Sequence, residues 1–321
     1  MKIAIVGTGH VGSSIAYAIV LKGLCNHLVL SSRDITKAQG DALDLQHTLA
    51  FCERPMIIEG SSTEDIKDCD ILVITSSVRL QDKVATRMEL APANIKLFKQ
   101  MIPVLAQNNP QAIFIIISNP VDVLTYLTTR LTELPPSRIM GIGTLVDSAR
   151  FRALLSAEEK IHPDDLRAYI LGEHGPNQFP VFSNAFAGSE QIADIPSNRR
   201  IFQEVSLAGF EVYKLKGYTN YAIATAACEV IKTIVYDDHR TMPLSTFFYE
   251  WQGIEDNCFS IPVVVGRAGI IRYLHPELNQ QEKISLEKTA ALMKENINNL
   301  IVAGDSGENS ALSIKIDSAD Y

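Results

Sequence analysis

The first 23 residues constrain the fold more than any other part of the chain. Residues 2–6 (KIAIV) form a short apolar run rich in β-branched residues, which predicts a buried strand. The motif GTGHVG (7–12) follows directly and leads into an apolar helical pattern. A G-x-G-x-x-G turn lets the backbone bend sharply and brings a pyrophosphate to the positive end of the following helix. The sequence therefore predicts a dinucleotide-binding unit at the N-terminus.

Strand and helix patterns then alternate. Further strands are predicted at 28–30, 56–58, 71–75, 112–117 and 139–142, and helices at 35–47, about 87–107 and 121–131. Runs such as ILVIT (71–75) are typical of a parallel sheet that is covered on both faces. Pro103 is expected to kink or divide the third helix. The fold class predicted is α/β, with a doubly wound parallel sheet of the Rossmann type.

The pattern changes to helix after Gly143, and we place the domain boundary there. Residues 1–142 are expected to form the dinucleotide-binding domain, and residues 143–303 an α+β substrate domain. The second domain is predicted to contain helices at 201–216, 220–236 and 280–303 and a strand at 259–265. Residues 304–321 are polar and are expected to form a C-terminal tail.

Composition excludes several classes of protein. With 46% hydrophobic and 21% charged residues, a chain of 321 residues suits a two-domain enzyme. The net charge of -8 argues against nucleic-acid binding. No apolar run has transmembrane length and the N-terminus lacks a signal-peptide layout, so we expect a cytoplasmic protein without a membrane partner. The five cysteines show no CxxC spacing, which predicts reduced thiols and no metal site.

A histidine between two glycines is the first candidate for chemistry. The segment 169–179 (YILGEHGPNQF) predicts a short strand that leads to His174, with Gly172 and Gly175 allowing close approach to the ring. An imidazole can take a proton from an alcohol and return it to a carbonyl near neutral pH. The alternative is a partly buried histidine that is hydrogen-bonded in a tight turn.

Asp147 and Arg150 could supply what this histidine lacks. They are three residues apart in a helical pattern and therefore project from one face. The carboxylate could orient the ring, and the guanidinium could bind a substrate carboxylate through two parallel hydrogen bonds. The alternative is a simple ion pair between the two. Asn119, in an Asn-Pro turn after a strand, could hold a carbonyl or a nicotinamide amide, or could cap the helix at 121–131.

The residues after the second strand bear on the choice of cofactor. A dinucleotide fingerprint has an acidic residue there that grips the adenosine ribose, whereas this chain has Ser32 followed by Arg33. A serine removes the repulsion of a 2'-phosphate and the arginine offers it a guanidinium, which favours NADP over NAD. In the alternative, Asp34 makes the ribose contact and Arg33 points into solvent.

Five motifs in sequence order together resemble the L-lactate/L-malate dehydrogenase family. They are GTGHVG (7–12), ISNPVDV (117–123), DSARFR (147–152), LGEHG (171–175) and KGYTNYAIA (216–224). The resemblance extends from Met1 to about residue 303, and two of its regions are especially similar to L-2-hydroxyisocaproate dehydrogenase-like members. It implies an NAD(P)-dependent 2-hydroxyacid dehydrogenase that is a homotetramer or a dimer. A non-catalytic dinucleotide-binding sensor with the same fold is the alternative from another class.

The resemblance also implies roles for single residues. His174 would move the hydroxyl proton, Asp147 would orient it, and Arg150 would clamp the substrate C1 carboxylate. Arg87, carried on a lid, would polarise the C2 carbonyl. Asn119 would contact both cofactor and substrate, and Thr219 would line the pocket. The cofactor site would comprise Gly7, Gly9, His10, Val11, Gly12, Ser32, Arg33, Thr75, Ser76 and Asn119.

Substrate choice in this family depends largely on the residue six positions before the lid arginine, which here is Gln81. An uncharged residue there favours monocarboxylic acids such as pyruvate, since a second carboxylate would be left unpaired in a closed site. Malate dehydrogenase-like activity stays open, because a shift of register could bring Arg79 or Lys83 into that place. Arg152 keeps a position that sugar-phosphate-activated members use, but Arg167 replaces their effector histidine, which favours ion pairs over a phosphate site.

Overall fold

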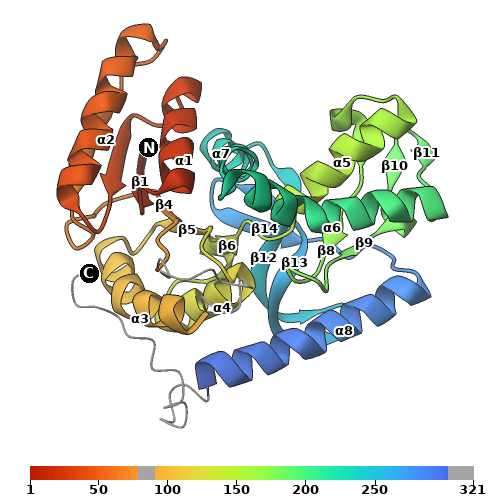
Figure 1. Ribbon diagram of the computed structural model, residues 1–321. Helices are drawn as coiled ribbons and strands as arrows, with labels where there is room; N and C mark the ends of the chain where they lie inside the picture. Colours follow the sequence, from red (N-terminus) through yellow and green to blue (C-terminus); the bar gives the residue numbers. More distant parts are fainter. Residues whose placement is uncertain (79–90, 303–321) are drawn as a thin grey trace.

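A computed structural model describes residues 1–78 and 91–302 (Figure 1). Nine strands form the main sheet: β1 (Lys2–Val6), β2 (His27–Ser31), β3 (Ile57–Ser61), β4 (Ile71–Ile74), β5 (Ile113–Ile116), β6 (Ile139–Gly141), β12 (Arg240–Trp251), β13 (Ile254–Gly266) and β14 (Gly269–Tyr273). Their order is β14-β13-β12-β6-β5-β4-β1-β2-β3. Strands β1 to β6 pair in parallel throughout. They form the doubly wound sheet that the sequence predicted.

The helices follow the predicted alternation. They are α1 (His10–Lys22), α2 (Ile35–Thr48), α3 (Ala91–Asn108), α4 (Val121–Leu131), α5 (Leu145–Glu159), α6 (Pro196–Lys216), α7 (Tyr221–Tyr236) and α8 (Gln280–Ile297), which a π-helical turn, Asn298–Val302, extends. Five two-residue strands make two small sheets: β7 (Leu166–Arg167), β8 (Ile170–Leu171), β9 (Phe179–Pro180), β10 (Phe186–Ala187) and β11 (Glu190–Gln191).

The structure differs from the sequence prediction in several places. Strands β12 and β14 were not predicted, and with β13 they continue the main sheet in antiparallel fashion from β6. Pro243 lies inside β12 opposite Pro262, and a proline within a run weakens any prediction of a strand. Helix α3 is not divided at Pro103. Helix α6 begins at Pro196, five residues before the predicted start at 201, because proline suits the first turn of a helix.

The sheet places the site at the carboxyl ends of its parallel strands. β2 and β4 flank β1 on opposite sides, so the strand order reverses there, and ligands of open α/β sheets bind outside such a reversal. One large apolar core covers the sheet, and a smaller one lies beneath α5 and α6 around Phe151. In residues 1–78 and 91–302, no helix combines the length and apolar character that crossing a bilayer requires.

Candidate active site

His174 is held by its backbone as well as by its ring. Strand β8 ends at Leu171, and Gly172 forms an antiparallel bridge with Ser260 of β13, with both N–H···O distances at 3.0 Å. Gly172 has a φ of +93°, a conformation that favours glycine. The His174 N–H donates to Asp122 Oδ2 at 2.8 Å. The histidine loop is therefore anchored to the sheet on one side and to α4 on the other.

The first turn of α5 is hydrogen-bonded to β8, the strand that leads to His174. Thr144 Oγ1 donates to the carbonyl of Ile170 at 2.5 Å, and the N–H of Ile170 donates to Ser148 Oγ at 2.9 Å. These bonds fix α5 relative to β8 and bring Asp147 to the imidazole. Asp147 Oδ2 lies 2.5 Å from His174 Nδ1. Because a carboxylate only accepts, Nδ1 carries the hydrogen of this bond.

The Asp147 carboxylate serves two partners at once. Its other oxygen, Oδ1, accepts from Arg150 at 3.0 Å. Only 4% of the Asp147 side chain is exposed, compared with 14% for His174 and 20% for Arg150. The acid is thus held away from water while the imidazole and the guanidinium reach the surface of a pocket. The two alternatives read from the sequence, an ion pair and a partner for the ring, are both realised.

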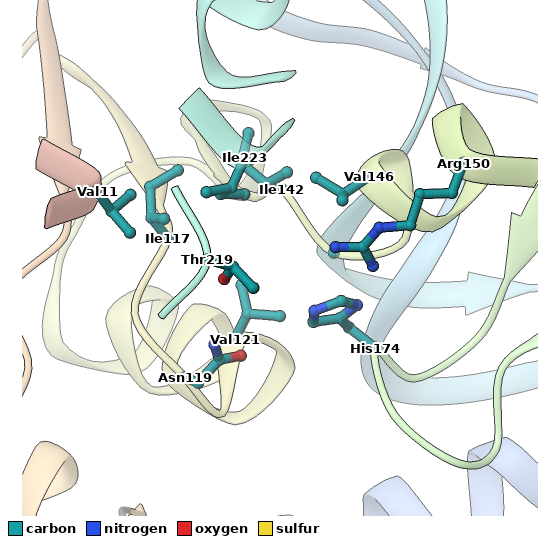
Figure 2. A pocket seen from close by; sticks show the side chains of 11 residues that line it. Val11, Ile117, Asn119, Val121, Ile142, Val146, Arg150, His174, Thr219 and Ile223 are labelled. Carbon is teal, nitrogen blue, oxygen red and sulfur yellow. The ribbon is translucent and has the colours of Figure 1, made fainter. Parts of the chain in front are cut away.

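These side chains line a cavity of about 80 Å³ (Figure 2). Arg150 and His174 lie on one side of it, and Val11 and Ile117 lie on the other. Its lining residues are Val11, Ile117, Asn119, Val121, Ile142, Gly143, Val146, Arg150, His174, Thr219 and Ile223. The pocket combines six Val and Ile side chains with the polar groups of Asn119, Arg150, His174 and Thr219, and small-molecule sites have such a mixed lining.

Asn119 lies at this pocket and is not the cap of the next helix. The N-cap of α4 is Pro120, and no side chain caps that helix. Asn94, which the sequence analysis missed, is fully buried and donates to the Asn119 carbonyl at 2.7 Å. Asn94 Oδ1 also accepts from the N–H of Val78 at 2.8 Å. A polar residue on the apolar face of a predicted helix was the available signal.

Asp122 is a second residue that the sequence analysis missed as part of the site. Its carboxylate is buried in α4 and receives the His174 backbone N–H. Burial raises the pKa of Asp122 to about 6, although the Ser245 hydroxyl and the His174 N–H both favour its charged form. An acid two residues after the Asn-Pro turn, in an otherwise apolar stretch, was the signal for it.

Asp122→Asn is expected to remove a pH-dependent loss of stability. The native carboxyl binds its proton more tightly than the unfolded chain does, so stability falls as the pH rises from about 4 to about 6. The loss is about 3 kcal/mol. The amide oxygen that the substitution introduces can still accept the His174 N–H. In urea unfolding, the free energy of the variant minus that of wild type should rise by about this amount between pH 4 and pH 7. A difference that is constant with pH would refute the assignment.

The glycine turn leaves room for a pyrophosphate. A Cβ at Gly12 would lie 1.9 Å from the carbonyl oxygen of Gly7, and one at Gly7 would lie 2.7 Å from the Ser76 nitrogen. The first and third glycines are therefore required by packing inside the protein. A Cβ at Gly9 would meet nothing within 4 Å. The open side of the turn thus faces the N-terminus of α1, where an anion is favoured.

Thr75 and Ser76 directly follow β4 and bond to the end of β1 and to the glycine turn. Thr75 Oγ1 donates to the carbonyl of Gly7, and Ser76 Oγ donates to the carbonyl of Val6 at 2.9 Å. The ends of β1 and β4 are therefore tied together beneath the place where a dinucleotide would lie. Both residues shape the proposed cofactor site through these bonds.

The ribose end of the site is defined by the end of β2. Ser32 is half-buried directly after β2, and Arg33 is exposed. Asp34 is the N-cap of α2, and its carboxylate accepts from the N–H of Thr36 at 2.9 Å. This capping bond gives Asp34 a structural task.

Two expected residues, Arg87 and Gln81, lie outside the described residues, as do Arg79 and Lys83. Arg152 and Arg167 are described. Arg167 donates to the backbone carbonyl of Asp164 at 3.2 Å, and burial lowers the pKa of Arg152.

Two family models together match almost the whole chain. Residues 1–141 match the lactate/malate dehydrogenase NAD-binding domain, and residues 144–302 match the lactate/malate dehydrogenase alpha/beta C-terminal domain. The chain belongs to the lactate/malate dehydrogenase family. It is therefore an NAD-dependent oxidoreductase that acts on 2-hydroxy acids.

Several similar proteins and solved structures are described as lactate dehydrogenases. An L-lactate dehydrogenase of Gloeobacter violaceus is 34% identical over 310 residues, which cover 94% of this chain and 93% of that protein. L-lactate dehydrogenase 2 of Bacillus cereus is 34% identical over 303 residues, covering 92% and 96%. The crystal structure of minor L-lactate dehydrogenase from Enterococcus mundtii has a TM-score of 0.88 at 30% identity and covers 93% of this chain and 98% of that one. The fold and function predicted from the sequence are thus confirmed.

Proposed function

We propose that this dehydrogenase interconverts a small L-2-hydroxy monocarboxylic acid and its 2-oxo acid, with lactate and pyruvate as the model pair. The observation that carries the proposal is the Asp147 carboxylate, which bonds to His174 Nδ1 at 2.5 Å and to Arg150 at 3.0 Å beside the pocket. One acid thereby orients a proton carrier and a carboxylate clamp.

The roles of these residues follow from that geometry. The nicotinamide supplies or accepts the hydride when it is bound. With Nδ1 bonded to Asp147, Nε2 is the His174 atom that would exchange a proton with the substrate oxygen. Buried Asp147 would hold the ring in the orientation in which Nε2 faces the substrate oxygen. Arg150 would bind the substrate carboxylate, and Asn119 and Thr219 would border the reacting carbons.

The charge of the described lining favours a substrate with one carboxylate. Among the lining residues in the described part of the chain, Arg150 is the only permanently charged cation, and six of the others are Val or Ile. A second carboxylate would need another cation, because an unpaired buried charge is costly. We propose Gln81 as the uncharged residue that meets the substrate side chain and Arg87 as the group that polarises the carbonyl.

An activity grid tests this proposal. Nicotinamide absorbance would be followed with pyruvate, a branched 2-oxo acid and oxaloacetate, each with NADH and NADPH, for wild type and Gln81→Arg. We expect wild type to prefer a monocarboxylic acid. The substitution should shift the ratio of kcat/KM toward oxaloacetate by about tenfold or more, since it supplies a partner for the second carboxylate. Absence of turnover on every pair would refute the enzyme function, and an unchanged ratio would exclude Gln81 as the selecting residue.

We also propose that the chain accepts NADPH in addition to NADH. The capping bond of Asp34 supports this proposal, because it favours Ser32 and Arg33 over Asp34 for the contact with the adenosine ribose. Ser32→Asp should lower kcat/KM for NADPH relative to NADH by about tenfold, because a carboxylate repels a 2'-phosphate. Steady-state kinetics with each dinucleotide measures this ratio. A ratio equal to that of wild type would mean that residue 32 does not face the 2' position.

The domain division and a homo-oligomeric state remain part of the proposal. We propose domains at residues 1–142 and 143–303 and a tail at 304–321. Helix α6 exposes several apolar side chains, among them Leu207, Phe210 and Leu215, and burying them suits a contact between copies of the chain. Light scattering would give the mass; a monomer at micromolar concentration would refute the oligomer.

A further inference from the structure

Two contacts join the first turn of α1 to the loop between α6 and α7. The rings of His10 and Tyr218 are stacked, with their centroids 3.8 Å apart and their planes 6° from parallel. Asn220 Nδ2 donates to Ser14 Oγ at 2.8 Å, and Ser14 Oγ donates to the carbonyl of His10 at 2.7 Å. The glycine turn and this loop, about 200 residues apart in sequence, are thus linked by a ring stack and by a chain of hydrogen bonds.

Both ends of this connection are next to residues that line the pocket. Val11 follows His10, and Thr219 follows Tyr218, and both Val11 and Thr219 belong to the lining. A shift of the loop relative to α1 would therefore change the distance between two walls of the pocket. The His10 ring is exposed and plays no part in the backbone geometry of the turn, which the glycines provide.

Lys216 makes the loop side of the stack rigid. Its ammonium lies 4.6 Å from the centroid of the Tyr218 ring and 3.8 Å from that of Tyr221, and it donates to Asn220 Oδ1 at 2.5 Å. Asn220 is buried, so its amide holds Lys216 and Ser14 in fixed places. Tyr218 therefore presents its ring to His10 from a loop with little freedom to rotate.

We infer that His10, through its stack on Tyr218, is a positioning residue that couples dinucleotide binding to formation of the substrate pocket. A dinucleotide pyrophosphate would settle at the N-terminus of α1, directly beside His10, and would order that turn. Because His10 is stacked on Tyr218, ordering of His10 would also restrict the loop that carries Thr219. Binding of either ligand then raises the affinity for the other, because the first ligand to bind has already ordered the wall of the pocket that both contact. This inference rests on the proposed function.

The test measures coupling between two ligands and not activity. The dissociation constant of NADH is determined by fluorescence titration with and without saturating oxamate, an unreactive analogue of pyruvate. The ratio of the two constants is the coupling factor. We expect His10→Ala to lower this factor about fivefold, because the stack is lost. His10→Phe restores a flat ring and should keep the factor within about twofold of wild type.

A control and three outcomes decide the inference. Tyr17→Ala removes an exposed ring from the same helix, about 10 Å further along its axis, and should leave the coupling factor unchanged. The inference is overturned if wild type shows no coupling, if His10→Ala weakens NADH binding equally with and without oxamate, or if His10→Phe behaves like His10→Ala. These failures differ from failure of the proposed function, in which wild type would bind NADH without turning over any 2-oxo acid.

Discussion

Replacing His174 by asparagine is expected to lower kcat for pyruvate reduction by a factor on the order of 10³. The imidazole is oriented by a 2.5 Å bond from Nδ1 to a carboxylate that is almost fully buried, and this bond places its Nε2 to carry the proton. An amide cannot exchange a proton near neutral pH. The substitution keeps the backbone N–H that donates to Asp122, and the histidine loop should remain in place.

Two measurements separate a chemical role from a structural one. NADH affinity should stay within about threefold of wild type, since His174 is not part of the glycine turn. His47→Asn, an exposed histidine on α2, is the matched control and should keep full activity. If His174→Asn retained a kcat within about twofold of wild type, the acid–base role of His174 would be wrong.

Arg150→Gln should lower kcat/KM for a 2-oxo acid by a factor on the order of 10² to 10³, mainly through KM. Removing one partner of a charge pair in a mostly enclosed site costs about 2–5 kcal/mol. Arg150 is 20% exposed and lies beside His174 in the pocket, so a substrate carboxylate bound there would lose both parallel hydrogen bonds. Arg150→Lys should recover only part of the loss, because an ammonium cannot form the two-point contact.

The control for this prediction is another arginine that is paired with a carboxylate. Arg199 binds Asp194 through two hydrogen bonds of 2.6 and 2.7 Å on an exposed surface. Arg199→Gln should leave kcat/KM unchanged. Arg150 also bonds to Asp147, so kcat of Arg150→Gln should be determined separately at saturating substrate. A loss confined to kcat, with an unchanged KM, would show that Arg150 acts only through Asp147 and does not clamp the substrate.

The sequence predicted those strands and helices whose local apolar pattern matches the way they are buried in the structure. Strand β1 and helix α4 were predicted with the bounds that the structure has, because a β-branched run before a glycine turn and an apolar 3.6-residue period are strong local signals. Strand β12 was missed. It contains Pro243 and mixes polar with aromatic residues, and only its neighbours β6 and β13 make it a strand.

The same division holds for the site. The sequence marked His174, Asp147 and Arg150 by residue type and spacing, and it marked Asn119 by its turn. It could not predict that Asp147 serves both other residues, since a three-residue spacing on a helix fits an ion pair equally well.

Residue chemistry and short-range spacing were thus determined by the sequence alone: a glycine turn after a strand, a histidine between glycines, and an acid and an arginine on one helical face. Only the tertiary structure decided which of these groups meet. It fixed the bond from His174 to Asp147, the burial that raises the pKa of Asp122 to about 6, and the stack of His10 on Tyr218. The physical reason is that contacts between residues 27 to about 200 positions apart depend on how whole elements pack, and no local pattern encodes that distance.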